Sequence, residues 1–133
     1  MARVLITGGS GYVGSNIAKE LVRIGCEAIV LFDLVPPKHQ YCLSLDVNNN
    51  SKDINSDSKS KVVYVRGDIC NYDSIDNAMK VYGINAVYHV AGYGLSGDSN
   101  LPAYDYETNM VNVFGTENVV KASLNNEVTA LGK

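Results

Sequence analysis

The stretch that decides the fold reads Val4-Leu5-Ile6-Thr7-Gly8-Gly9-Ser10-Gly11-Tyr12-Val13-Gly14. Its apolar start predicts a short buried strand. Apolar residues at helical spacing follow the glycines until Gly25 ends the pattern, namely Val13, Ile17, Leu21 and Ile24. A strand, a tight turn and a helix are therefore expected in direct succession. Such a turn is a candidate phosphate-binding site, because glycines let the backbone approach a ligand closely and a helix N-terminus presents free N–H groups.

Two registers of the glycine motif fit the sequence, and spacing alone does not choose between them. Gly9, Gly11 and Gly14 give GxGxxG, whereas Gly8 in place of Gly9 gives the wider GxxGxxG. A second apolar run ends in Asp33, at the distance from the motif where dinucleotide-binding folds place an acid. A carboxylate there can bind the ribose hydroxyls and repels a 2′-phosphate, which predicts NAD rather than NADP. The alternative is a turn that only reverses the chain, followed by an Asp that caps a strand.

Composition bounds the class of protein. The 133 residues, 46% of them hydrophobic, suit one globular domain, and a net charge of −3 without a basic patch argues against a nucleic-acid partner. No apolar run reaches transmembrane length, and Met1-Ala2-Arg3 leads straight into the first strand, so we expect a cytoplasmic protein without a signal peptide. The three cysteines show no CxxC spacing, which predicts buried thiols and no metal site.

The rest of the chain alternates predicted strands and helices. Residues 36–61 read as a flexible polar insertion. Strands are expected at 62–65, at 86–91 and from 128, and helices from about 72 to Tyr82 and over 104–123. Asn71 or Asp73 can cap the first of these helices, and Gly83 ends it. This alternation predicts an α/β fold, a Rossmann-type doubly wound parallel sheet truncated near the start of its fifth strand.

Four stretches together resemble the extended short-chain dehydrogenases/reductases. They are residues 7–14, Arg66-Gly67-Asp68-Ile69, His89-Val90-Ala91-Gly92, and residues 112–118. Within that family, residues 88–97 look most similar to the 3β-hydroxysteroid dehydrogenase/isomerase-like branch. The resemblance implies a partial NAD(P)-binding Rossmann domain over residues 1–133, with the substrate domain absent.

The resemblance also implies a cofactor site. Its phosphate-binding part would consist of Gly8, Gly11, Tyr12, Val13 and Gly14. Asp33 would hold the ribose, and Asp68 and Ile69 would flank the adenine. Ala91, Gly92 and Tyr93 would line the inner half of the dinucleotide. Asn112 would brace the last helix near the active site, unless it only bonds a neighbouring carbonyl.

The catalytic pair of the family is missing. These enzymes move a proton through a Tyr whose pKa is lowered by a Lys four positions later, and none of the nine tyrosines here has a Lys at that position. We therefore predict no catalytic residue in this chain, and expect the pair to belong to missing sequence. We do not expect Tyr93 or His89 to replace the catalytic pair. A Tyr in a glycine-rich loop more often packs or covers a ligand, and a His in an apolar strand is usually a hydrogen-bonded core residue.

Two functions remain open from the sequence. The first is an NAD-dependent oxidoreductase of 3β-hydroxysteroid dehydrogenase type, which oxidises a steroid or another small secondary alcohol to a ketone. In this form we expect the truncated chain to bind dinucleotide without turnover. The second is a non-catalytic module that binds NAD or a partner, for example as a dimer through the 104–123 helix.

Overall fold

A computed structural model describes residues 2–42, 47–48, 60–93 and 106–133 of the chain. Its strands form one sheet in the order β3-β4-β2-β1-β5-β6, and each described pairing is parallel. The strands are β1 (Arg3–Thr7), β2 (Ala28–Asp33), β3 (Val47–Asn48), β4 (Lys61–Arg66), β5 (Ala86–His89) and β6 (Ala130–Gly132). This topology confirms the predicted doubly wound α/β fold.

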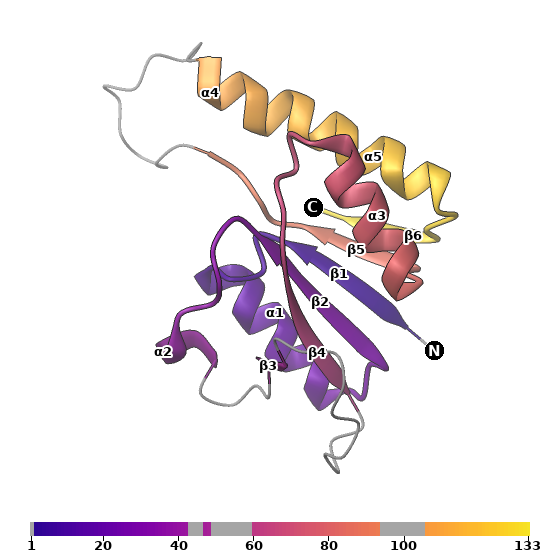
Figure 1. Ribbon diagram of the computed structural model, residues 1–133. Helices are drawn as coiled ribbons and strands as arrows, with labels where there is room; N and C mark the ends of the chain where they lie inside the picture. The colour runs from indigo at the N-terminus through magenta and orange to yellow at the C-terminus, as the bar shows by residue number, and fades with distance from the viewer. Residues whose placement is uncertain (1, 43–46, 49–59, 94–105) are drawn as a thin grey trace.

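Helices cover both faces of the sheet (Figure 1). On one face lies α1 (Tyr12–Arg23), with the short α2 (His39–Cys42) beside it. On the other face lie α3 (Tyr72–Tyr82) and a long helix composed of α4 (Tyr106–Asn109), the π-helical segment η1 (Met110–Gly115) and α5 (Thr116–Asn125). The sheet is thus the middle of three layers.

Alternation along the strands builds a core on each side of the sheet. In β1, Val4 and Ile6 pack toward α1 while Leu5 packs toward α3 and α5, and all three are at most 2% exposed. Because successive strand side chains point to opposite faces, a continuous apolar run serves both cores. Burial of each such side chain contributes about 1.5–3 kcal/mol.

The buried faces of the helices differ in part from what the apolar pattern of the sequence indicates. Of the four apolar residues at helical spacing, Val13 and Ile24 are 55% and 60% exposed; Val13 was also expected to bind the cofactor. The buried positions of this helix are Gly14, Ser15, Ala18 and Leu21. In the last helix Tyr106, Val113, Phe114 and Val120 are likewise exposed. There the small residues Gly115, Ala122 and Ser123 face inward with Val119, which lets the helix lie close to the sheet.

Most element bounds agree with the sequence-based prediction, with three differences. The strand expected at 86–91 ends at His89, and Tyr88 is 39% exposed. Within residues 36–61, the structure has α2 and β3, neither of which was predicted; residues 43–46 and 49–59 lie outside the described part. The strand expected from residue 128 begins at Ala130.

Candidate functional site

A cavity of about 420 Å³ lies at the carboxyl ends of the strands. Its walls come from the loops after β1, β2, β4 and β5, and from η1. All eleven residues expected to bind the cofactor line this one cavity: Gly8, Gly11, Tyr12, Val13, Gly14, Asp33, Asp68, Ile69, Ala91, Gly92 and Tyr93. The carboxyl edge of a parallel sheet is where open α/β folds bind ligands.

The structure resolves the register of the glycine motif. Gly8, Gly11 and Gly14 line the cavity, whereas Gly9 packs against β2, where an added Cβ would lie 2.7 Å from the Cα of Leu31. The wider GxxGxxG register is therefore the one that faces the cavity. Gly9 serves the packing of the turn on the sheet.

The three cavity-lining glycines have different roles. Gly8 has a φ of +68°, and a Cβ on it would lie 2.8 Å from the backbone nitrogen of Ala91. A Cβ on Gly14 would collide with the carbonyl oxygen of Gly8. At Gly11, by contrast, the only atom near an added Cβ is the Gly8 oxygen at 3.5 Å, so the glycine leaves open space there. The fold therefore does not require a glycine at this position, and the open space, called the cradle below, has room for a ligand.

The N-terminus of α1 points into this cradle. Gly11 is the N-cap residue and offers no side chain to the first N–H groups of the helix. These groups carry a partial positive charge and are suited to bind phosphate oxygens. The geometry therefore fits a pyrophosphate.

Asp33 is held rigidly at the end of β2. Its Oδ2 accepts a hydrogen bond from the backbone N–H of Ser10 at 3.1 Å, and its Oδ1 accepts one from Leu34 at 2.7 Å. Each oxygen keeps a lone pair, so the carboxylate can still accept from ribose hydroxyls. The first of these bonds also ties the acid to the phosphate-binding turn.

Asp68 and Ile69 form the wall after β4. Asp68 is exposed, and its Oδ1 accepts from the backbone N–H of Cys70 at 2.9 Å. Ile69 is buried, and its carbonyl accepts from the side chain of Asn118 at 2.9 Å. Its side chain fills the space that Gly115 leaves free, since a Cβ there would lie 2.6 Å from the Ile69 Cδ1.

The wall after β5 is held by Asn112. Its Oδ1 accepts from the Tyr93 N–H at 2.9 Å, and its Nδ2 donates to the Tyr93 carbonyl at 3.0 Å. Both polar groups of the Asn112 side chain thus fix the backbone of the loop, rather than bonding within their own helix. The bracing role expected for Asn112 acts through Tyr93.

His89 is a buried core residue with both ring nitrogens hydrogen-bonded. It is 3% exposed, with Nδ1 2.7 Å from the Thr7 Oγ1 and Nε2 2.8 Å from the Thr116 Oγ1. Burial lowers the pKa of the imidazole, and the charge of Lys133 lowers it further. This confirms the expected satisfied core histidine.

Several lining residues were not predicted: Phe32, Leu34, Gly67, Val90 and Val111. Gly67 could have been predicted from the sequence, because it lies inside the recognised Arg66–Ile69 motif. A Cβ at this position would collide with the Phe32 ring. No sequence motif pointed to Val111, since only the folding of η1 over the loop brings this residue to the cavity.

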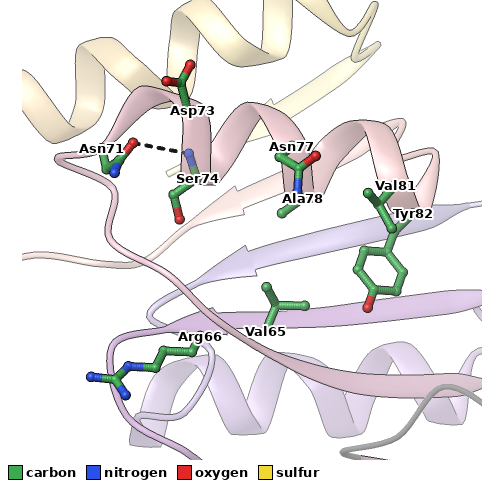
Figure 2. Close-up of a pocket in the computed structure, with 9 residues that line it drawn as sticks. All are labelled: Val65, Arg66, Asn71, Asp73, Ser74, Asn77, Ala78, Val81 and Tyr82. Atoms are coloured by element: carbon green, nitrogen blue, oxygen red, sulfur yellow. Dashed lines mark hydrogen bonds between the residues drawn. The ribbon is translucent and has the colours of Figure 1, made fainter.

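A second cavity, of about 640 Å³, lies between β4 and the outer side of α3 (Figure 2). Its lining includes Arg66, Asn71 and Asp73, and none of the eleven expected site residues. Within the described ranges, no group of three His, Cys, Asp or Glu residues could hold a metal ion. No helix among the described residues is long and apolar enough to cross a membrane.

Comparison with known sequences gives consistent similarities. The sequence profile of the family described as "Polysaccharide biosynthesis protein" matches residues 4–131. Short-chain dehydrogenase/reductase family 42E member 1 of Danio rerio is 33% identical over 96% of this chain and 27% of its own length. The UDP-glucose 4-epimerase of Rickettsia rickettsii is 33% identical over 95% of this chain and 34% of its own. The chain thus spans about a third or less of these relatives.

Solved structures match over nearly the whole chain. The Bordetella bronchiseptica enzyme WbmH, crystallised with NAD⁺, has a TM-score of 0.71 and 25% identity over 98% of this chain and 38% of its own. The Thermus thermophilus UDP-glucose 4-epimerase, crystallised with NAD, has a TM-score of 0.67 and 25% identity over 97% and 36%.

Proposed function

Since this chain belongs to the extended short-chain dehydrogenase/reductase family, within the group described as polysaccharide biosynthesis proteins, we propose that it forms the NAD-binding part of an NAD-dependent epimerase or dehydrogenase. The observation that carries the proposal is the cavity at the sheet edge, where the glycine turn, the α1 N-terminus and Asp33 converge. The cofactor is NAD, as in the crystallised structural neighbours.

Each part of the cavity has a task in holding the dinucleotide. The cradle at Gly11 and the first N–H groups of α1 bind the pyrophosphate. Asp33 accepts from the ribose hydroxyls and repels a 2′-phosphate. The backbone of residues 91–93, fixed by Asn112, borders the inner half. Bound NAD supplies a hydride acceptor at its nicotinamide ring.

The chain by itself is expected to bind without turnover. The Tyr-x-x-x-Lys pair is not found in the 133 residues, and a positioned acid or base typically contributes about 10²- to 10⁴-fold to a rate.

For the substrate, we favour a sugar nucleotide. Relatives named UDP-glucose 4-epimerase and the family description both support a carbinol group on a sugar. The steroid substrate expected from residues 88–97 has no counterpart in the names of the relatives reported above. A sugar hydroxyl and a steroid hydroxyl are both secondary alcohols, so the same cofactor site serves either.

Calorimetric titration of the purified chain with NAD and with NADP tests the proposal. We expect saturable NAD binding, weaker NADP binding, and a loss of NAD affinity of about tenfold or more in Asp33→Ala, because two charge-assisted hydrogen bonds are lost. The matched control is Asp73→Ala, which removes an exposed carboxylate beside the other cavity (Figure 2). No NAD binding by the folded chain, or a loss in Asp73→Ala instead, would contradict the assignment.

A further inference from the structure

The contacts of His89 determine where its proton lies. The Thr7 Oγ1 accepts from the backbone N–H of Ala91 at 3.2 Å and from that of Val90 at 3.1 Å, which the Thr7 carbonyl shares at 3.2 Å. Its own proton is then left to donate to Nδ1 of His89. On the other side, the Thr116 hydroxyl donates to the Asn112 carbonyl at 2.7 Å, so it can only accept from Nε2. The network therefore assigns the neutral tautomer protonated at Nε2.

These bonds close a ring around one wall of the cavity. From Thr7, at the end of β1, the ring passes through His89 to Thr116, and from there through the Asn112 carbonyl. The Asn112 side chain then holds Tyr93 by both backbone groups. The loop itself returns to Thr7 through the N–H groups of Val90 and Ala91. Every member of the ring has a defined donor or acceptor role.

The ring encloses the segment 90–93, and all four of its residues line the cavity. The phosphate-binding turn is not part of the ring, although Gly8 follows Thr7 directly. Deleting a bond in the ring should therefore loosen the inner wall while it leaves the cradle at Gly11 in place.

We propose that His89 is a positioning residue, which holds residues 90–93 for the inner, nicotinamide-bearing half of the dinucleotide by joining Thr7 to Thr116. The inference rests on the proposed function. His89 does not line the cavity, but through the ring it affects the binding of the nicotinamide-bearing half of NAD and not of the other half. A second proton on Nδ1 would face the Thr7 hydroxyl, which already accepts twice, so a charged imidazole would break the ring.

The test compares two ligands that share one half. ADP occupies only the phosphate cradle and the ribose site, whereas NAD also reaches the inner wall. Thr116→Val keeps the shape of the side chain but removes the acceptor of His89. We expect it to weaken NAD binding by about 3- to 10-fold, the effect of one lost hydrogen bond, and to change ADP binding less than twofold.

Ser123→Ala is the matched control. Ser123 donates to the Val119 carbonyl at 2.7 Å, the same bond along the same helix that Thr116 makes to Asn112, but its hydroxyl group is not the partner of His89. We expect it to change neither affinity. A purely structural role of the buried hydroxyl groups would make the two variants alike.

Coupling through His89 is measured with a second variant, His89→Asn, whose side-chain oxygen can still accept from Thr7 but cannot reach Thr116. In that background Thr116→Val should cause no further loss of NAD affinity. If Thr116→Val lowers the affinities for NAD and for ADP equally, while its circular dichroism spectrum is unchanged, the positioning role is overturned. This outcome does not require that His89→Asn folds. Absence of binding of both ligands to the unmodified chain would instead overturn the proposed function and, with it, this inference.

Discussion

At the scale of single residues, the site separates glycines that the ligand needs from glycines that the fold needs. Gly11 has an ordinary extended conformation, with φ of −81°, and room for a Cβ. Gly14 has no such room, because the Gly8 carbonyl lies against it. Both stand in the same motif, so the sequence does not distinguish them.

We predict opposite outcomes for alanine at these two positions. Gly11→Ala should keep the melting temperature within about 2 °C and weaken NAD binding at least tenfold, because the methyl group fills the cradle. Gly14→Ala should lower stability by about 1–3 kcal/mol through overpacking. Thermal melts and titrations of both variants check this. A Gly11→Ala chain with undiminished NAD affinity would contradict the placement of the pyrophosphate.

At the scale of elements, three helices end in the same way. After α1, α3 and α5 the chain turns through a residue with positive φ, and the N–H groups of that residue and of the next one donate to carbonyls in the last turn of the helix. That residue is Gly25 after α1, Gly83 after α3 and Glu127 after α5, with φ of 84°, 60° and 55°. This is the Schellman arrangement, which favours glycine because a side chain strains the left-handed conformation.

Glu127→Gly should therefore stabilise the protein by about 0.5–1 kcal/mol, since Glu127 is exposed and its backbone has a positive φ. The reverse change at the first helix is the control. An added Cβ at Gly25 meets no atom within 4 Å, so Gly25→Ala reports backbone strain alone and should destabilise by about 1 kcal/mol. Urea denaturation of both variants measures the difference. A destabilised Glu127→Gly would show that this end of α5 is not strained.

Asp76 joins α3 to the end of α5. Its Oδ1 accepts from the side chains of Asn125 at 2.9 Å and Asn126 at 2.7 Å, and its Oδ2 accepts from Lys80 at 2.7 Å. The Lys80 hydrogen bond, followed by that of Asn125, lowers the pKa of this carboxyl from 3.8 to about 2. The folded state therefore binds this proton less readily than the unfolded state.

The pH dependence follows from that difference. The stabilisation is fully present above about pH 4 and is lost as the pH falls toward 2, because the unfolded state takes up the proton first. Asp76→Asn should lower stability at pH 7 by about 1–2 kcal/mol and flatten the stability curve between pH 2 and 4. Glu20→Gln, which removes an exposed partner of Arg23, is the control and should change little. Parallel curves for wild type and Asp76→Asn would contradict the assigned pKa.

At the scale of the whole molecule, the sheet brings four separate loops to one edge, so a ligand there holds distant parts of the chain together. Loops after β1, β2, β4 and β5 all contribute to the cavity. A ligand that binds only the folded chain stabilises it by RT ln(1 + [L]/Kd), which grows with the logarithm of the ligand concentration.

We predict that NAD at about 100 times its dissociation constant stabilises the chain by about 2.7 kcal/mol, which raises the melting temperature by roughly 8–12 °C. NADP at the same concentration should raise it less, because its 2′-phosphate meets the Asp33 carboxylate. Differential scanning fluorimetry with both ligands, and with Asp33→Ala as control, measures this. Equal shifts with NAD and NADP would refute the role of Asp33.

Outside residues 36–61, the sequence by itself determined the alternation of strands and helices, the phosphate-binding turn, Asp33 and the ends at Gly25 and Gly83. These features are local: an apolar run, a glycine at positive φ or an acid at a strand end has its physical consequence within a few residues. The set of eleven site residues came from the resemblance to the dehydrogenase/reductase family, and all of them lie around one cavity.

Only the tertiary structure decided which face of each helix is buried, and it placed Gly8 at the cavity, as the resemblance implied and the spacing alone did not. Val13 and Ile24 continue the apolar pattern of the first helix but are exposed, whereas the small residues Gly14 and Ala18 are buried there. The ring through His89 joins residues 82 and 27 positions apart in the chain. No local pattern encodes it, because hydrogen-bond roles between distant side chains are fixed only when the sheet and the last helix pack together.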